Sequence, residues 1–560
     1  MFVRVKTNPN SPRKSVQIVH SCRIGDKVRQ KIIKHVGVAN NEEELIQLKL
    51  LAETIKIRLE NEGQELLFSP EILAENIIKA KAEKDKEKYS DDDYNVNIKE
   101  LREECRIISG IHDIYGKLFD ELHLRSIFSD YGKDVSILSI FKDIVLARIA
   151  NPVSKAKSVS MLEEKFGISL DLDKVYRMMD KIDDEAIKRL NEIAYRETLG
   201  LFGGKIDVIF FDATTLYFES FTEDEFRRNG YSKDLKFNQP QVLIALMVTK
   251  EGLPIGYKAF SGDTYEGHTL IPALKALKKQ YKLDKVVYVA DSGMFNRDNI
   301  EELETLENNE FNYIVGARIK SMPKTLREQI LNPANYSELD ANTKIATFDY
   351  KGRKLLVTHS LNRARKDKAD REKGIEKLRN KLKKHKTPKE YLSNQGYKKY
   401  LQVEGKSKIS LNEEKIREDA MWDGLKGLLT NKTNLLTNEE ILHQYSNLWY
   451  VEESFRITKH DLRIRPIYHY KESRVKAHLA ISFVAYMLVR YLEYRVKLQY
   501  KKLSPERIRQ MLISIQTSIL VCNKKRIRYG IPSRMSIETK KIYRLMNVKR
   551  TTTPFIIKKF

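Results

Sequence analysis

The stretch Lys205–Ser220, KIDVIFFDATTLYFES, contains an apolar run that Asp212 interrupts just before two threonines. A short apolar run of this kind predicts a buried β-strand. An ionised carboxylate is costly to bury unless it is paired or bound to a metal. Asp212 therefore indicates a functional partner, although an aspartate that caps a turn at a strand end is the alternative interpretation.

A mixed sheet is predicted to grow outward from this strand. The elements that follow it are strands 241–249 and 253–260, joined at Glu251-Gly252, then helix 268–281 and strand 285–290. The fourth strand ends at Asp291, in the sequence ADSG. The order β-β-β-α-β is that with which a ribonuclease-H-like fold begins, and there the first and fourth strands are neighbours. We therefore expect Asp212 and Asp291 at one edge of the sheet, where ligands commonly bind.

A third acid lies in Tyr445–His469, YSNLWYVEESFRITKHDLRIRPIYH, which predicts a helix with Pro466 after its end. At about 100° per residue, Tyr445, Leu448, Glu452 and Lys459 project within an arc of roughly 60°. An amphipathic helix with a solvated Glu452 is the alternative interpretation. Donors suited to phosphate oxygens follow directly: Arg463, Arg465, Tyr468 and His469.

The spacing in this helix resembles the Y-x2-R-x3-E-x6-K signature of the YREK branch of DDE transposases in the insertion-sequence-4 family. Tyr445, Glu452 and Lys459 occupy three of the four positions, and Leu448 stands where the family has an arginine. Arg456, one turn beyond Glu452, is a candidate for the missing cation. The segments RIRPIYH and AHLAISF that follow look like the insertion-sequence-1634-type subgroup, and the order of elements resembles this family over nearly the whole chain.

This resemblance implies a DNA transposase that cleaves strands at transposon ends and transfers them into target DNA. It implies that Asp212, Asp291 and Glu452 hold two Mg²⁺ ions, which Mn²⁺ can replace, about 3.5–4 Å apart at the scissile phosphate. The implied partners are double-stranded DNA with terminal inverted repeats, target DNA and a second copy of the chain in a synaptic homodimer. The expected DNA-binding residues are Tyr445, Arg456, Lys459, Arg463, Arg465 and His469.

Composition agrees with a nucleic-acid partner. The formal charge is +25 over 560 residues, although a Lys-rich organism could give the same average. Cys22, Cys105 and Cys522 are too far apart for a zinc ribbon or disulfide framework, which fits a reducing cytoplasm. The most apolar run, 477–489, is too short to span a bilayer and predicts a core helix. We expect no membrane partner, and a cytoplasmic prokaryotic protein that joins the nucleoid when bound to DNA.

The predicted fold class is mixed α/β, with a ribonuclease-H-like core interrupted by a β-rich insertion and flanked by helical N-terminal DNA-binding and C-terminal regions. The predicted domains are a small basic β module (1–40), helices and a charged linker (41–100), a helical DNA-binding domain (101–203), the first part of the core (204–320), the insertion (321–435), the second part of the core (436–500) and a basic helical C-terminal region (501–560).

Several accessory features leave two interpretations open. The N-terminal sheet either contacts DNA ends or only packs, and the break at Asn151-Pro152 separates either a helix-turn-helix or two helices of an ordinary bundle. The basic helix 363–389 is either solvated or contacts flanking DNA. Trp422 either holds a flipped base or is a core residue.

Two other classes of function remain open at this stage. A ribonuclease-H-like nuclease or resolvase would share the three acids but act on a structured junction. A DNA-binding regulator derived from an inactive transposase would need no metal. The rival acids Glu219, Asp298 and Glu453 lie on other faces or farther along the chain, and no Walker loop, nucleophile elbow or zinc-ligand spacing is present.

Overall fold

The structure is a computed structural model, and its described residues form two compact units. Unit 1 comprises Met1–Lys205, Thr214–Asp263 and Glu452–Phe560, and unit 2 comprises Ile206–Ala213 and Thr264–Val451. The residues outside the description are 8–12, 25–26, 40–41, 61–90, 132–134, 220, 231–237, 266–267, 270, 276–286, 292–299, 303, 305–311, 385–398, 405–407, 432–435 and 560. Gly25-Asp26, a sequence signal for a hairpin turn, and most of the charged linker predicted after residue 60 therefore lie outside it.

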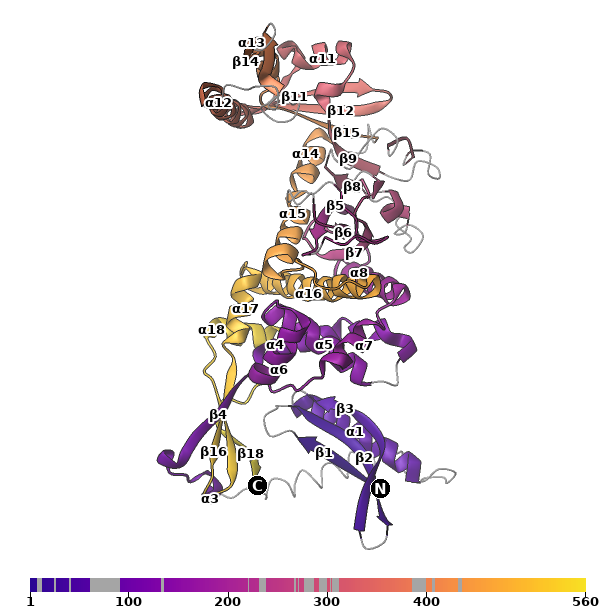
Figure 1. The fold of residues 1–560 in the computed structure, drawn as a ribbon, viewed down its shortest axis with the longest axis vertical. Coiled ribbons are helices and arrows are strands. Elements are labelled where there is room, and N and C mark those ends of the chain that lie inside the picture. The colour runs from indigo at the N-terminus through magenta and orange to yellow at the C-terminus, as the bar shows by residue number, and fades with distance from the viewer. Residues whose placement is uncertain are drawn as a thin grey trace. The chain divides into compact units, whose positions relative to one another are not determined.

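The small N-terminal sheet of unit 1 has the predicted antiparallel order. Its strands are β1 (Phe2–Thr7), β2 (Lys14–Ile24) and β3 (Lys27–Ala39), and helix α1 (Glu42–Glu60) covers one face (Figure 1). Alternation along β2 turns Val16 and Ile18 inward, where they meet Leu45 and Ala52 of the helix. This gives the module its own hydrophobic core.

A helical region of unit 1 packs around one long apolar helix, α16 (Glu472–Gln499). Its partners include α4 (Gly110–Glu121), α5 (Val135–Ala150), α7 (Leu172–Met179) and α8 (Asp184–Leu201). The remaining helices of this region are η2 (Leu124–Tyr131), α6 (Lys155–Phe166), α17 (Pro505–Ile513) and α18 (Ile537–Leu545). Among the described residues, α16 is the one helix long and apolar enough to cross a membrane, but 94% of that stretch is buried. The prediction of a core helix is confirmed.

The break predicted at Asn151-Pro152 is also present. Helix α5 ends at Ala150, and α6 begins after Ser154, whose hydroxyl accepts a hydrogen bond from the Lys157 amide. Asp171 caps α7 in the same way through the Asp173 amide. Whether these helices read DNA stays a prediction.

The prediction that residues 501–560 are helical is wrong in part. Strands β16 (Gln516–Cys522), β17 (Ile527–Pro532) and β18 (Phe555–Lys559) form a sheet with β4 (Leu101–Ile108), in the order β18-β17-β16-β4 (Figure 1). The strand pattern ILVC was overlooked because charged residues surround it. Its core includes Cys522, Ile527 and Tyr529. The short elements α3 (Asp91–Tyr94) and η1 (Ile98–Glu100) precede β4.

The central sheet has the strand order of a ribonuclease-H-like fold. In unit 1, β5 (Val208–Tyr217) neighbours β6 (Gln241–Val248), which pairs antiparallel with β7 (Pro254–Ser261). In unit 2, the start of β5 pairs parallel with β8 (Val287–Ala290), and β8 pairs parallel with β9 (Asn312–Ala317). The order β7-β6-β5-β8-β9 therefore has the antiparallel pair β7-β6 on one side of β5 and two parallel strands, β8 and β9, on the other. Residues 271–275 are helical, within the helix predicted between β7 and β8.

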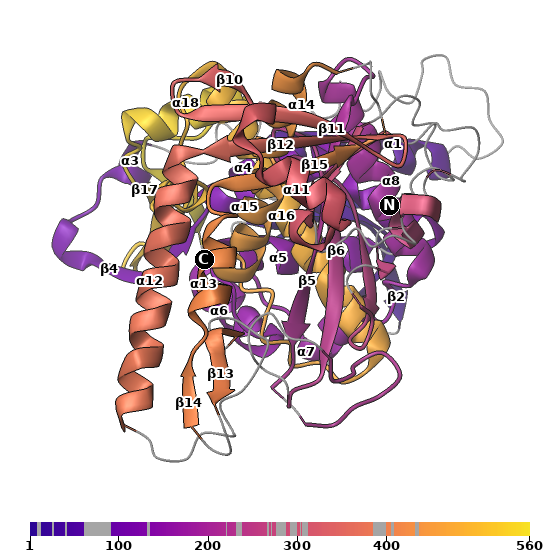
Figure 2. The ribbon, with the colours of Figure 1, turned by 90° about the horizontal axis from the view of Figure 1, so that it is seen from above.

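The β-rich insertion extends the sheet of unit 2. Strand β15 (Leu425–Thr430) pairs with β9, and β12 (Arg353–Ser360), β11 (Thr343–Tyr350) and β10 (Ser337–Asp340) follow outward. The predicted basic helix is α12 (Leu361–Lys384), which lies beside the hairpin β13 (Leu401–Glu404) and β14 (Lys408–Leu411) in Figure 2. Short helices complete the insertion: η4 (Ile319–Ser321), α11 (Lys324–Leu331), η5 (Pro333–Asn335) and α13 (Glu413–Ala420).

Candidate active site

Two of the three predicted carboxylates occupy equivalent positions on neighbouring parallel strands. Phe211 of β5 pairs with Ala290 of β8, and Asp212 and Asp291 are the next residues on each strand. Asp212 is half-buried and Asp291 is exposed. We call this pair the acidic edge. The apolar residues of both strands fix the register from within the sheet, so the first open positions fall on the two acids.

Tyr445 contacts the acidic edge from helix α14 (Asn438–Ser446). Its hydroxyl donates a hydrogen bond to Oδ1 of Asp291 at 3.2 Å, and its ring is 7% exposed. The ammonium of Lys426 lies 4.3 Å from the centre of the ring. Helix α14 is anchored by a capping box between Thr437 and Glu440. Sequence reasoning assigned Tyr445 to a DNA phosphate, whereas in the structure it contacts a carboxylate.

The single helix predicted over the signature is wrong. Helix α14 ends at Ser446, α15 (Trp449–Arg456) begins three residues later, and the chain then widens into a π-helix, η8 (Ile457–Asp461). Tight hydrogen bonds from Leu448 to Tyr445 and from Val451 to Leu448 span the junction. A uniform 100° step therefore does not describe the signature positions, and Leu448 is a buried core residue.

Glu452 is exposed on α15, which is anchored within unit 1 by its neighbours in sequence. The buried hydroxyl of Tyr486 lies within hydrogen-bond distance of the Ser454 hydroxyl, at 2.6 Å, and of the Gly252 carbonyl, at 2.9 Å. Arg490 lies 3.4 Å from the Glu453 carboxylate and 2.6 Å from that of Glu493. These contacts hold the helix that carries Glu452 against α16.

The rival acids have other surroundings. Glu453 is part of the buried Arg490 network and lies 3.7 Å from Arg456, so it has a structural role. Glu219 is exposed after the end of β5, and Asp298 lies outside the described residues.

The cations predicted to bind DNA are found in two places. Arg456 is exposed beside Glu453, and Lys459 is half-buried in the π-helix. Arg463, Arg465 and His469 line a cavity of about 490 Å³ in unit 1. Burial and the nearby cations lower the pKa of His469 to about 4, so its ring is neutral at physiological pH.

Two residues of this cavity were missed from the sequence. Arg148 and Lys155 are 4% exposed and lie among its lining residues. Their only local signal is the helix break at Asn151-Pro152, after which Lys155 begins α6. Trp422, the candidate for holding a base, is half-buried in the turn before β15, and its role stays a prediction.

The donors of the acidic edge suit a hard cation. Mg²⁺ and Mn²⁺ prefer carboxylate oxygens, and Asp212 and Asp291 supply two such groups directly after paired residues of neighbouring strands. Over the part of the chain that the structure describes, no group of three or more His, Cys, Asp or Glu side chains is gathered closely enough to hold an ion. The assignment of all three acids to metal therefore stays a proposal.

Comparison with known proteins agrees with the strand order. Residues 203–488 match the family model described as transposase DDE domain, and residues 3–66 match the N-terminal domain of IS1634 family transposases. No curated protein matches the chain. Two solved structures are similar at 13% identity: the Mos1 transposase paired-end complex with left transposon end (50% of this chain, 78% of that chain, TM-score 0.14) and the Mos1 mariner paired end complex with Mn (49% and 78%, TM-score 0.13).

The sheet has the strand order of a ribonuclease-H-like fold, and the match to the DDE domain identifies an enzyme that transfers phosphoryl groups of nucleic acids. Because the DDE model covers more than half of the sequence, the chain belongs to the DDE transposases, and its N-terminal module is of the IS1634 type. It is therefore a DNA transposase, a family of enzymes that use divalent metal ions. The nuclease and regulator alternatives are not favoured.

Proposed function

We propose that this transposase cleaves DNA at the inverted repeats of an insertion sequence and joins the freed ends to target DNA, with Asp212, Asp291 and Glu452 as the metal-holding acids. The observation that carries the proposal is the register of β5 and β8, which places two aspartates side by side. Glu452 joins them as the acid of a signature that is matched at Tyr445 and Lys459. The proposal also assigns the chain to the YREK branch of the insertion-sequence-4 family.

The chain's own residues prepare this site in two ways. The Tyr445 hydroxyl donates to Oδ1 of Asp291 and orients the carboxylate. Ser454 and Tyr486 fix the helix of Glu452. Two Mg²⁺ ions, when bound, would activate an attacking oxygen and stabilise the leaving oxygen.

The reaction proposed has two transfers. Water attacks the phosphodiester at the transposon end, the P–O bond to the 3′ oxygen breaks, and a 3′-hydroxyl is released. That hydroxyl attacks a target phosphate and expels a target 3′-hydroxyl in turn. Both partners of a synaptic homodimer would act on paired ends, in the cytoplasm of a prokaryote and on its nucleoid. Arg456 and Lys459 would contact the terminal phosphates.

The test measures strand cleavage of duplexes that carry the inverted repeats found beside the gene. We expect cleavage at the repeat boundary with Mg²⁺ or Mn²⁺, none with Ca²⁺, and loss in Glu452→Gln with DNA binding retained. Glu439→Gln removes an exposed carboxylate of α14 and is the matched control. Full activity of Glu452→Gln would exclude Glu452 from the site, and cleavage independent of the repeats would favour a nuclease.

A further inference from the structure

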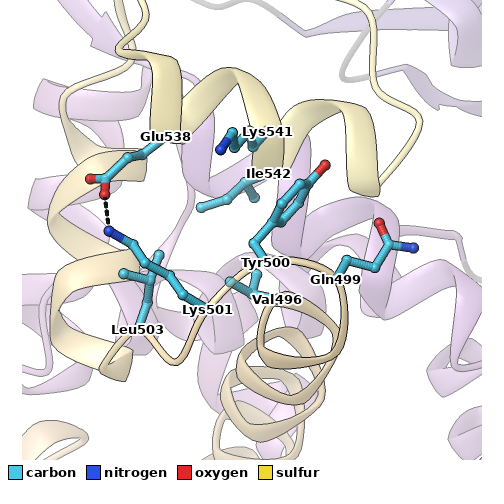
Figure 3. Close-up of a pocket in the computed structure, with 8 residues that line it drawn as sticks. All are labelled: Val496, Gln499, Tyr500, Lys501, Leu503, Glu538, Lys541 and Ile542. Atoms are coloured by element: carbon cyan, nitrogen blue, oxygen red, sulfur yellow. Dashed lines mark ion pairs between the residues drawn. The ribbon is translucent and has the colours of Figure 1, made fainter.

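The cavity lined by Arg463, Arg465 and His469 has an unusual charge composition. Its lining also includes Arg148, Lys155 and Lys157, so it contains five cations and no carboxylate. We call it the basic cavity. A second cavity of unit 1, of about 310 Å³ between α16 and α18, shows the usual arrangement: the Lys501 ammonium lies 2.7 Å from the Glu538 carboxylate (Figure 3). Positive charge in the basic cavity has no such counter-ion in its lining.

Two buried donors in the basic cavity, on Lys155 and Arg148, lack a complete set of partners within the described part of the chain. Lys155 is 4% exposed, and no ion pair or hydrogen bond of its ammonium is found there. Arg148 donates from Nη1 to the carbonyls of Leu462 and Arg463, but its Nε has no acceptor. His478 donates through Nε2 to the Ile464 carbonyl, so its Nδ1 is an acceptor in the neutral ring and does not add to these donors. Buried polar groups normally have partners, so the Lys155 ammonium and Nε of Arg148 indicate a missing acceptor.

The backbone around the basic cavity adds to its preference for an anion. Residues Ser154 to Lys157 form the first turn of the 12-residue helix α6, where amides and the helix dipole favour negative charge. On the opposite segment, Arg463 has a positive φ of 43°, a conformation that costs energy for a residue with a Cβ. The hydrogen bonds from Arg148 hold this turn in place.

We propose that the basic cavity is a phosphate receptor that binds a backbone phosphate of the transposon DNA, with Lys155 and Arg148 as the central donors. This deepens the proposed function, because it adds a DNA contact that needs no metal. The cavity is larger than one phosphate group, so a sugar and its phosphate enter together. Five cations give an attraction for a polyanion that a buried ion pair would cancel.

The surroundings of Lys155 in this cavity also change the pKa of its ammonium. Burial, together with Arg148, holds the pKa of Lys155 well below its usual 10.5. A bound phosphate favours the charged ammonium, so binding would be coupled to proton uptake. The charged or titratable groups that share the cavity with it are Arg148, Lys157, Tyr176, Arg463, Arg465, Tyr468, His469 and His478.

The main experiment measures DNA affinity against salt concentration, with the Glu452→Gln protein in EDTA so that no cleavage occurs. Lys155→Met should weaken binding roughly tenfold and reduce the salt slope by about one. Lys155→Arg should restore most of both. Lys541→Met, in the cavity of Figure 3, removes an equal charge and should leave the affinity and slope near those of the parent protein.

Folding and the source of the phosphate are controlled separately. Lys155→Met buries a methyl in place of an unpaired ammonium and should raise Tm, which shows that it folds. Sodium phosphate should raise Tm of the parent protein above sodium chloride of equal ionic strength, and Lys155→Met should lose this difference. The proposal would be overturned if Lys155→Met left the salt dependence of DNA affinity unchanged. If Lys155→Met abolished the rise of Tm in phosphate but left DNA affinity unchanged, the cavity would be a receptor for free phosphate. Neither result would affect metal-dependent cleavage, which tests the acids.

Discussion

The acidic edge and the basic cavity differ in how their charged side chains are exposed and which groups surround them. Asp212 lies within β5 and is half-buried, Asp291 follows β8 and is exposed, and a hydrogen bond from Tyr445 orients Asp291. Arg148 and Lys155 are buried without carboxylates, which costs stability. The acids are placed where a substrate and ions can approach, and the cations are placed where they can enclose a group. We propose catalysis for the acidic edge and DNA binding for the basic cavity, and the two roles can be tested independently.

The largest effect is expected at the acidic edge. Asp212→Asn should lower the rate of cleavage by at least about 1000-fold, because a metal-held transition state loses several kcal/mol. DNA affinity in EDTA should change little. Glu219→Gln, an exposed acid after the same strand, should retain full activity in the same single-turnover assay. Equal losses in both variants would show that charge near β5, and not a specific ligand, is what matters.

A smaller loss is expected from the residue that orients Asp291. Tyr445→Phe removes one hydrogen bond to a carboxylate and should slow cleavage by roughly tenfold. If Tyr445 instead holds a terminal phosphate, the variant should lose DNA affinity and show a smaller salt slope. Measuring the rate and the slope on the same protein separates the two roles.

Packing beneath Glu452 offers a test through stability. Gly252 has a φ of +75°, and a Cβ there would fall on the Arg490 guanidinium. Gly252→Ala should lower the free energy of unfolding by about 1–3 kcal/mol and slow cleavage, while the basic cavity keeps its affinity for phosphate. Gly200→Ala in α8, where a Cβ meets nothing within 4 Å, should stabilise the protein slightly and is the control.

The basic cavity predicts a dependence of stability on pH. The pKa of His469 is about 4 in the folded chain, against about 6.5 unfolded, and burial also lowers the pKa of His478. Between these two pH values the unfolded chain binds more protons than the folded chain. The contribution of the neutral His469 ring to the free energy of unfolding is therefore fully present above pH 6.5 and decreases as pH falls towards 4. The free energy of unfolding should fall between pH 7 and 5, and His469→Gln should make this fall about 1–2 kcal/mol smaller. His443→Gln, exposed on α14, should leave the Tm–pH curve unchanged.

The acids were accessible to sequence analysis because their signal is local. Asp212 interrupts an apolar strand and Asp291 ends one, so alternation and length alone predict both positions, and the order of strands predicts that they are neighbours. The interrupted helix around Leu448 was not predictable in this way, because the break depends on burial of Leu448 and on tertiary packing. Arg148 and Lys155 carry no pattern that distinguishes them from other cations, and only folding brings them to residues 463–478.

The strands after α17 were missed for a related reason. Their pairing partner β4 lies far away along the chain, and a short strand with mixed residues gives a weak signal. The contact between Ser109 and Ile515 spans 406 residues, and no periodicity within either segment records it.

That sheet also orders events during synthesis. At ribosomal speeds β4 leaves the ribosome about 20–80 s before β16 exists to pair with it, so its edge stays open throughout this interval. This sheet therefore forms only after β16 has been synthesised, and a copy of the gene truncated before β16 leaves β4 exposed for aggregation. Synthesis of β16 thus acts as a check on the enzyme, because a product that lacks β16 is unable to form this sheet.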